Sequence, residues 1–578
     1  MPDTNVQIAK HLSLMADILQ ILDANRFKII AFQKAARVIE SLPEDVGVMD
    51  KKTLLDLDGI GKGAADKILE FAQTGQISEL DELLGELPSG LIKLLEVPTL
   101  GPKTIALLWK QAGVVDVKTL KKALDDPQTT KIKGIGPKKL ETIKKNLAFS
   151  ETAAKRHLIA PAHLKAVYFV SQLKTLKEVT NATYAGSLRR GKETIGDIDI
   201  LVAADAKHAE KITQRFVSLE PVAQVLLSGK TKTSVRTKRG FQIDLRIVPG
   251  ESWGPALLYF TGSKEHNVRL RERALSQGYS LNEWALTNTK TVKPFKAGDE
   301  KAIYHKLGLQ FIPPELREDR GEIDAAEADN LPNLITVADI KSELHAHTHA
   351  SDGSLSIREL AGLAYDRGFH TIAVTDHSKS QVQAHGLDAK RLEQHIQDVH
   401  AVRDEMKGKI NVLAGSEVDI LSDGKLDYPD SLLKALDIVV ASPHAALSQD
   451  TKKCTARLLK AINNRYVHII GHPTGRLLGR RAGLHPDMPA LFKAAAERGV
   501  ALEINANHHR LDLRDVHARA AIESGCLLAI DTDTHHANNF NELQYGVLTA
   551  RRAWAEPRHV VNCLSEGDLV KWLKACRR

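Results

Sequence analysis

The chain has few cysteines and no long apolar run. Its four cysteines, Cys454, Cys526, Cys563 and Cys576, form no C-x-x-C pair, which argues against a disulfide framework and a thiolate zinc site. No apolar run approaches the ~18–20 residues that a membrane-spanning helix needs. The start of the chain, MPDTNVQIAKHL, lacks the basic and apolar segments of a signal peptide. We therefore expect a cytoplasmic protein with reduced thiols and no membrane partner.

The remaining composition is that of a soluble globular protein, with 43% hydrophobic and 26% charged residues. Domains usually run ~100–200 residues, so a chain of 578 residues is expected to form three or four. Its formal net charge of +8 suits a polyanionic partner, although many basic proteins bind no nucleic acid. The 24 histidines crowd into the C-terminal half and carry more information.

The spacing of apolar residues divides the chain into regions. Residues 1–150 have helical spacing interrupted by glycine turns, whereas residues 160–310 mix helices with strands such as "DIDILV" and "FQIDLRIV". The polar stretch 315–333 is typical of an interdomain linker. From about residue 338, seven short apolar strands alternate with helices, which predicts a parallel barrel or sheet. Polar residues stand at the carboxyl ends of these strands, where α/β barrels place their chemistry.

Three N-terminal segments share a glycine turn that leads into a helix: 57–68, 97–108 and 132–143. Such a turn exposes backbone N–H groups at the positive end of the helix dipole, which can hold a phosphate without reading a base. One copy alone would be a plain helix connection, but three copies favour binding to a DNA backbone. The glycines concerned are Gly59, Gly61, Gly101, Gly134 and Gly136. The second copy has Thr99 where a first glycine would stand, and the third lies in a lysine-rich run with Lys131, Lys133, Lys138, Lys139, Lys144 and Lys145.

The strongest signal is the segment 186–202, GSLRRGKETIGDIDILV. Asp197 and Asp199 are two residues apart on a predicted strand, so both carboxylates should point to one face. Asp244 lies on a second predicted strand. Three converging carboxylates would repel one another unless divalent cations neutralised them, and two Mg²⁺ ions (or Mn²⁺) suit an in-line phosphoryl transfer.

The turn before these carboxylates carries a hydroxyl, Ser187, and two guanidiniums, Arg189 and Arg190, which suit a triphosphate. A lone D-x-D is most often a surface strand end. The combination of G-S, R-R-G and G-D-x-D in one short segment favours a nucleotidyltransferase instead.

The predicted strands of the C-terminal half end in imidazoles and carboxylates. Six of the seven carry ligand-type residues: His345, His347, Asp352, His377, Glu417, His444, His472, Asp533 and His535. A lone histidine at a strand end is more often structural, but this repetition is hard to explain that way. Nitrogen and oxygen ligands without sulfur suit Zn²⁺ or Mn²⁺, which would lower the pKa of a bound water and supply a hydrolytic nucleophile.

The segment 257–271, LLYFTGSKEHNVRLR, is more specific than the nucleotidyltransferase pattern alone. Together with this segment, residues 1–317 resemble a family X DNA polymerase, the family of DNA polymerase beta. The resemblance implies that Asp197, Asp199 and Asp244 bind the catalytic metals. It also implies a set of nucleotide contacts: Ser187, Arg190 and Gly196 to the triphosphate, Tyr259, Phe260 and Gly262 beside the sugar, Asn267 at the minor-groove edge of the base, and Arg271 on the template strand. Lys264 departs from the acidic residue of the animal enzyme, so a base contact there does not transfer.

Animal members of this family carry a lyase activity that uses a Schiff-base lysine, and Lys67 matches that lysine. The neighbouring lysine of the family pattern is Gly63 in this sequence, and the supporting tyrosine is Phe32. These two departures argue against lyase activity.

The segments ELHAHTHASDG, TDHS, GSEVDI, SPH, GHP and DTDTH resemble the PHP (polymerase and histidinol phosphatase) domain, in the expected order over residues 338–578. The family holds three metals with nine ligands on a distorted (β/α)7 barrel, and all nine positions are ligands in this sequence. We therefore expect an active phosphoesterase. Arg476, Arg480 and Arg481, which follow His472, could hold a DNA phosphate.

The whole chain thus resembles bacterial family X DNA polymerases with a C-terminal PHP domain. The resemblance implies six parts: a helix-hairpin-helix domain over 1–85, a fingers-like helical domain over 86–150, an α+β nucleotidyltransferase palm over 151–250, a thumb over 251–317, a linker over 318–337 and the PHP domain over 338–578.

We interpret the chain as a template-directed DNA polymerase in gap-filling and base excision repair, whose PHP domain acts on 3′ ends as a 3′–5′ exonuclease or phosphoesterase and could cleave abasic sites. Its partners would be gapped or nicked DNA and dNTP, and we expect a monomer. The cofactors would be Mg²⁺ or Mn²⁺ in the palm and three Zn²⁺ or Mn²⁺ in the PHP domain. Three alternatives stay open: a template-independent nucleotidyltransferase acting on RNA ends, a DNA-end-binding scaffold with a structural PHP domain, and a small-molecule phosphatase fused to a polymerase.

Overall fold

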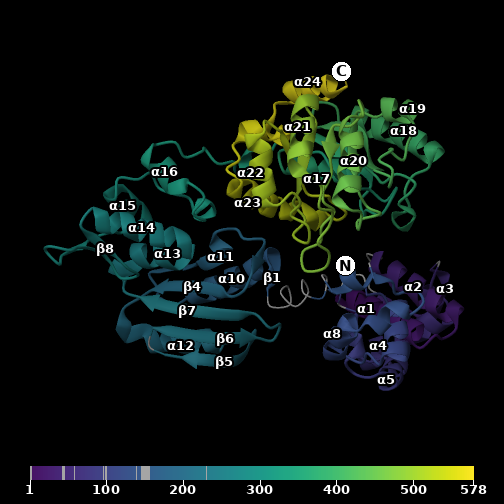
Figure 1. Cartoon of the computed structure of the whole chain (residues 1–578), viewed down its shortest axis with the longest axis horizontal. Coiled ribbons are helices and arrows are strands. Elements are labelled where there is room, and N and C mark those ends of the chain that lie inside the picture. The colour runs from purple at the N-terminus through teal and green to yellow at the C-terminus, as the bar shows by residue number, and fades with distance from the viewer. Residues whose placement is uncertain are drawn as a thin grey trace. The chain divides into compact units, whose positions relative to one another are not determined.

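The computed structural model describes residues 3–41, 46–57, 59–95, 97, 100–137, 139–144, 147, 156–229 and 231–577 (Figure 1). Thr99, Lys138 and Lys145 lie outside the described residues. The chain divides into two compact units, residues 1–154 with 479–482, and residues 155–478 with 483–578. Within the described part of the chain, no helix combines the length and the apolar character that crossing a bilayer requires.

The first unit is built from helices, as the sequence predicts. They are α1 (Asp3–Ile21), α2 (Arg26–Ser41), α3 (Lys51–Asp56), α4 (Lys62–Thr74), α5 (Ser78–Gly85), α6 (Leu91–Leu94), α7 (Pro102–Ala112) and α8 (Val117–Asp125), with a further helical stretch over 139–144. Ile8, Leu12, Met15 and Leu19 recur at helical spacing in α1 and are buried. A continuous apolar cluster runs from Ile8 to Leu147, so the two helical domains expected in this region share one core.

The second unit begins with a five-stranded sheet in the order β2-β4-β7-β6-β5. Figure 1 shows β4, β7, β6 and β5 with α10 and α12. The strands are β2 (Asn181–Tyr184), β4 (Ile198–Ala203), β5 (Val222–Ser228), β6 (Lys232–Thr237) and β7 (Gln242–Val248). The helices α10 (Ile159–Lys174) and α12 (Ala209–Val217) bury Phe169 and Phe216 in the same apolar cluster as Ile200 of β4. Strands β4 and β7 are parallel neighbours, and this pairing sets Asp199 beside Asp244.

A helical region with a small sheet follows. It contains α13 (Trp253–Thr261), α14 (Lys264–Ser276), β8 (Tyr279–Leu281), β9 (Leu286–Asn288), β10 (Pro294–Phe295) and α15 (Glu300–Lys306). The segment 318–337, expected to be a linker, differs from that expectation. It forms α16 (Glu322–Glu327), whose Ile323 and Ala326 are buried in the same cluster as Leu270 and Tyr304. The polar composition hid these apolar residues, which are spaced as on a helix face.

The C-terminal region is the predicted array of seven parallel strands, paired in chain order from β11 to β17. They are β11 (Ser342–Glu343), β12 (Thr371–Val374), β13 (Asn411–Asp419), β14 (Ile438–Ser442), β15 (Ile469–Ile470), β16 (Ala501–Asn505) and β17 (Leu528–Asp531). A parallel bridge between Ala346 and Thr534 joins the first strand's end to the last strand's end, so the sheet closes nearly into a barrel.

Helices surround this barrel: α17 (Ile357–Asp366), α18 (Ala389–Glu405), α19 (Asp430–Ala435), α20 (Thr451–Ile462), α21 (Met488–Arg498), α22 (Asp515–Glu523) and α23 (Leu543–Arg552). The last helix, α24 (Glu566–Cys576), packs Leu573 against inward-facing residues such as Val440 and Ile469. His468, directly before β15, lies 3.2 Å from the Leu573 carbonyl oxygen. Helix α24 therefore covers the amino ends of the strands, and the carboxyl ends are left for polar residues.

Candidate active sites

The three carboxylates of the five-stranded sheet come together. One carboxylate oxygen of each of Asp197, Asp199 and Asp244 lies within 4.8 Å of the other two. Asp199 and Asp244 are neighbours in register on β4 and β7, as their sequence context predicts. Asp197 is not in a strand, because β4 begins at Ile198, but the bend that leads into the strand still brings its side chain to the cluster.

The electrostatics of this cluster favour a bound cation. Burial raises the pKa of Asp199, and the charges of Asp197 and Asp244 raise it further, to about 7. Asp244 has partners of its own, since Lys232 Nζ lies 2.7 Å from Oδ2 and Gln242 Nε2 donates to Oδ1 at 3.1 Å. An all-oxygen cluster that cannot ionise fully by itself fits divalent ions such as Mg²⁺.

A glycine brings the preceding turn directly against the carboxylates. Gly186 has a φ of +62°, and a Cβ built on it would lie 2.2 Å from Asp199 Oδ2. No larger side chain fits, so the backbone that carries Ser187 approaches the acidic cluster as closely as it can. Ser187 lies in α11 (Gly186–Arg189), and Arg190 follows that helical turn.

Both arginines of this turn bind a carboxylate. Arg189 forms a bidentate pair with Glu300, with Nη1 and Nη2 donating to its two carboxylate oxygens at 2.9 and 2.6 Å. Arg190 donates from Nε to Glu318 at 3.0 Å and from Nη1 to the Thr261 carbonyl at 2.5 Å.

Two glycines, Gly196 and Gly262, complete this side of the site together with Arg156. The sequence reasoning missed this arginine. A Cβ on Gly196 would lie 3.4 Å from Nη1 of Arg156, so a second guanidinium stands beside the turn that leads to Asp197. Gly262 has a φ of +73°, and its Cβ would lie 3.0 Å from Nη1 of Arg190. Arg156 is far from the motif in sequence and carries no motif of its own, so only the fold reveals it.

The residues expected along the nucleotide lie on α13 and α14. Tyr259 and Phe260 contact each other edge to face, and Arg246 of β7 lies 5.1 Å from the centre of the Phe260 ring. Asn267 donates from Nδ2 to the Tyr259 carbonyl at 2.8 Å, whereas its buried Oδ1 makes no hydrogen bond within the described residues. Arg271 is exposed on α14.

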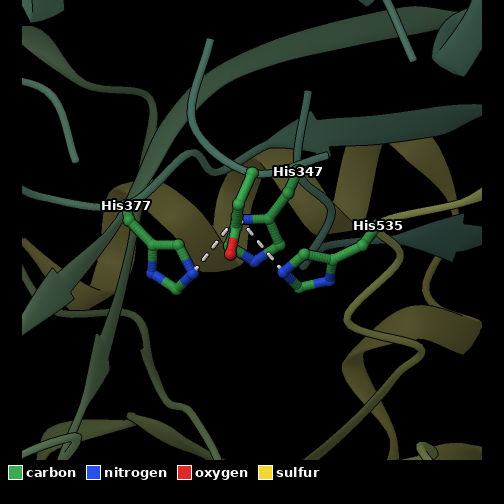
Figure 2. A group of neighbouring side chains, drawn as sticks. His347, His377 and His535 are labelled. Carbon is green, nitrogen blue, oxygen red and sulfur yellow. Dashed lines mark ion pairs between the residues drawn. The ribbon is translucent and has the colours of Figure 1, made fainter. Parts of the chain in front are cut away.

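All nine predicted ligands of the barrel gather at the carboxyl ends of its strands. Glu417 of β13 lies at the centre, with a ring nitrogen of each of five histidines within 2.8–3.6 Å of its carboxylate: His345, His347, His377, His444 and His472. Asp352 lies 3.6 Å from His377 and 3.3 Å from His535. Asp533 lies 3.1 Å from His347. Figure 2 shows His377 and His535 on either side of His347, with their rings turned toward one point.

Unsatisfied buried atoms show that these residues fit metal ions. In the described residues, no hydrogen bond reaches His345 Nε2, His347 Nε2, His377 Nδ1, Glu417 Oε2 or Asp533 Oδ1, although all five atoms are buried. A buried polar atom without a partner is costly, and five that converge on one place are improbable unless something else binds them. Their atoms form overlapping groups of three or four potential ligands, which suits a multinuclear centre.

Several residues that the sequence reasoning missed hold these ligands in place. Glu503 of β16 has Oε1 2.6 Å from Nδ1 of His345, and Asp419 of β13 bonds Nδ1 of His444. Each pair turns the opposite nitrogen toward the centre. Arg510 places Nε 3.8 Å from Asp533 Oδ2. Glu503 and Asp419 stand at strand ends like the ligands themselves, and that position is the signal that could have identified them.

Arg476, expected to hold a DNA phosphate, is buried. It donates from Nη2 to Glu193 at 2.7 Å and to the Leu511 carbonyl, and its burial keeps it away from solvent-borne DNA.

In the first unit, the glycine turns lead into helices as predicted. Gly61 and Gly101 are the N-cap residues of α4 and α7, and Gly136 precedes the third helical stretch. A Cβ on any of these three would meet nothing within 4 Å. Gly59 and Gly134 instead have φ values of +99° and +93°, so the turn itself requires them.

Lys67 is poorly suited to Schiff-base chemistry. Its Nζ lies 3.1 Å from Glu79 and 3.4 Å from Glu70. Burial lowers the pKa of Lys67, but these carboxylates outweigh burial and raise it above its ordinary value. A nucleophilic amine needs the opposite shift.

Family models match five parts of the chain. They describe a helix-hairpin-helix domain (residues 3–77), a SAM-like helix-hairpin-helix tandem (91–148), the DNA polymerase beta palm (162–238), the DNA polymerase beta thumb (256–318) and the PHP domain (343–507). These matches define a polymerase of the beta class joined to a PHP domain.

Comparison with individual proteins shows which members of this polymerase class the chain is similar to. "DNA polymerase/3′-5′ exonuclease PolX" of Bacillus subtilis (strain 168) is 37% identical over 571 residues, which cover 98% of this chain and 99% of that protein. DNA polymerase lambda of Arabidopsis thaliana is 26% identical over 55% of this chain and 62% of its own length. A "Probable phosphatase" of Thermoanaerobacter sp. (strain X514) is 29% identical over 41% of this chain and 95% of its own length. The chain belongs to the bacterial family X DNA polymerases, with helix-hairpin-helix, palm, thumb and C-terminal PHP domains.

Proposed function

We propose that this chain is a template-directed DNA polymerase that fills short gaps during DNA repair, and that its PHP domain degrades 3′ ends as a 3′–5′ exonuclease. The observation that carries the proposal is the presence of two complete ligand clusters in one full-length match to a polymerase/exonuclease. The helix-hairpin-helix turns support the repair role, because they would hold DNA by its backbone regardless of sequence.

In the palm, Asp197, Asp199 and Asp244 would hold two divalent cations, with Mg²⁺ or Mn²⁺ favoured by the all-oxygen ligands. Such ions lower the pKa of an attacking 3′-hydroxyl and stabilise the charge on the leaving pyrophosphate. Ser187, Arg190 and the Gly196 turn would bind the triphosphate, and Arg156 beside Gly196 would add a positive charge. Tyr259, Phe260 and Gly262 would contact the sugar, Asn267 would reach the minor-groove edge of the base, and Arg271 would contact the template.

In the PHP domain, the nine ligands would hold three Zn²⁺ or Mn²⁺ ions. Ions in such a centre lower the pKa of a bound water and polarise a phosphodiester. Glu503 and Asp419 would fix the orientation of His345 and His444. Arg510 would contact the substrate phosphate, because its guanidinium lies beside Asp533 of the centre and can form charge-assisted hydrogen bonds to phosphate.

The test assays primer extension and 3′-end degradation on one gapped DNA substrate. The Asp197→Ala/Asp199→Ala variant should lose extension and keep degradation, and the His345→Ala/His347→Ala variant should do the opposite. Exposed residues of the same types, Asp205→Ala and His400→Ala, serve as matched controls. Normal degradation by the histidine variant would refute the nuclease assignment, and incorporation that ignores the template base would refute template direction.

A further inference from the structure

The turn that follows the triphosphate-binding residues packs against the PHP domain. Residues Arg190–Glu193 connect Ser187 to the Gly196–Asp197 segment. Gly191 has a φ of +66°, and its Cβ would lie 3.3 Å from Leu548 and 3.7 Å from Cδ of Arg552, both on α23. A helix of the PHP domain therefore forms the wall behind this turn of the palm.

Arg552 binds both the backbone and the carboxylate partner of Arg190. Its Nη1 donates to the Arg190 carbonyl at 2.7 Å and to Glu318 Oε1 at 2.9 Å. The same Glu318 oxygen accepts from Nε of Arg190 at 3.0 Å. The side chain of Arg552 is 3% exposed, so these bonds are shielded from water and fix the Arg190 guanidinium in one place.

Other charges complete this cluster. Asp515 of α22 accepts from Nε and Nη2 of Arg552 at 3.1 and 2.8 Å and from Arg320 at 3.1 Å. Burial would raise the pKa of Glu318, but the positive charges of Arg552, Arg190 and Lys192 lower it to about 2. Glu318 is therefore ionised at neutral pH and remains a strong acceptor for both arginines.

A second contact holds the far end of the same turn. Arg476 donates to Glu193 at 2.7 Å, and it lies four residues after His472, on a loop that carries a metal ligand of the PHP domain. Two arginines of the PHP domain thus hold the two ends of the turn. Arg552 binds it at Arg190, and Arg476 binds it at Glu193.

We propose that Arg552 of the PHP domain is a positioning residue for nucleotide incorporation, because it holds the Arg190 turn in the conformation that receives the triphosphate. The proposal rests on the proposed role of Arg190 in triphosphate binding. It makes the PHP domain part of the polymerase's nucleotide site, independently of the metal centre in the barrel.

The experiment measures single-nucleotide incorporation by the full chain with saturating gapped DNA and varied dNTP. Arg552→Gln should raise the KM for dNTP about tenfold, as expected for lost charge-assisted hydrogen bonds, while the rate of 3′-end degradation stays unchanged. Glu193→Gln removes the negative charge from the second contact on the palm side and should raise the same KM. The matched control is Arg403→Gln, which breaks a half-buried pair with Asp437 inside the PHP domain and should leave the KM unchanged.

The outcomes separate positioning from general stability. Loss of folded protein would lower both activities without changing the KM for dNTP. If Arg552→Gln lowers both activities in this way, and Glu193→Gln also leaves the KM unchanged, the proposal is wrong. The Arg552→Gln/Glu318→Gln double variant should raise the KM for dNTP by less than the product of the two single-variant effects, because both side chains act through one cluster. If Arg190→Gln raises the KM but Arg552→Gln does not, triphosphate binding by Arg190 stands and the positioning role falls.

Discussion

At the scale of single residues, Glu503 tests whether the PHP metal centre depends on groups behind its ligands. Its carboxylate lies 2.6 Å from Nδ1 of His345 and also accepts from the backbone N–H of His472. We expect Glu503→Gln to lower 3′-end degradation by ~10–100-fold, as is usual when a partner of a metal-bound histidine is lost. The measurement is exonuclease rate together with metal content per chain.

The control for this variant is Glu523→Gln, an exposed carboxylate in α22 of the same domain that pairs with Arg519. It should leave both quantities unchanged, and primer extension should be unaffected in either variant. Full metal content and full activity in Glu503→Gln would show that His345 needs no such partner.

Arg510 tests how the PHP domain recognises a phosphate. Because its guanidinium makes only a long contact, 3.8 Å, to Asp533 among the residues that the structure describes, we expect it to be available for an anionic substrate. We expect Arg510→Ala to raise the KM for DNA in 3′-end degradation about tenfold with a smaller change in kcat, since a charge-assisted contact to phosphate is lost. Steady-state kinetics on a 3′-ended oligonucleotide measure this. A pure kcat effect with an unchanged KM would instead assign Arg510 to the stability of Asp533.

The sequence predicted the carboxylates and histidines that cluster at the two sites, but not the residues that hold them in place. Asp199, Glu417 and the histidines could be predicted because their residue types are rare at strand ends and recur there. Arg156, Glu318 and Arg552 could not, since arginine and glutamate are common on any surface. Their roles depend on contacts between residues far apart in the sequence, 38 positions for Arg156 and Thr194 and 234 for Arg552 and Glu318.

At the scale of elements, the glycine turns contain two kinds of glycine, one that leaves open space where a phosphate could bind and one that the backbone conformation of the turn requires. Gly136 has open space where a Cβ would stand, whereas Gly134 has a φ of +93°. We expect Gly136→Ala to leave the melting temperature unchanged but to weaken binding to gapped DNA about tenfold, because its methyl group would obstruct a phosphate at the helix N-terminus. Gly134→Ala should destabilise the first unit by ~1 kcal/mol or more through backbone strain.

Thermal unfolding and DNA titration at one fixed salt concentration distinguish the two glycines. Gly85→Ala, at the end of α5 and also with open space around its Cβ, is the matched control for binding and should leave the DNA affinity unchanged. Unaltered DNA affinity in Gly136→Ala would mean that the third turn is only a helix connection.

Apolar periodicity predicted the order of the elements, but it did not predict the residues at which they begin and end. Seven strands appear in the predicted order, because each is a short apolar run and six of the seven carry ligand-type residues. Asp197 lies outside β4 because strand pairing with β7 begins only at Ile198. The segment 318–337 is polar in composition, yet α16 buries Ile323 and Ala326, since two apolar residues suffice to anchor a short helix.

At the scale of the whole molecule, the two active sites differ in ligand chemistry. The palm cluster offers carboxylate oxygens, whereas the PHP cluster combines carboxylates with six imidazoles. Imidazole favours Zn²⁺ and similar transition metals, and carboxylate oxygens suit Mg²⁺. We expect a chelator with nitrogen donors, such as phenanthroline, to abolish 3′-end degradation in buffer with excess Mg²⁺ and to leave primer extension intact.

Both activities are followed on one gapped substrate, before and after the chelator, and restored with Zn²⁺ or Mn²⁺. A chelator with oxygen donors in excess of Mg²⁺ should stop extension as well, which controls for access to the palm. Because Arg552 and Arg476 clamp the palm turn through side chains that do not bind metal, emptying the PHP centre should leave the dNTP KM unchanged. If extension falls together with degradation, the metal centre itself supports the palm, and the two sites are coupled through the His472 loop.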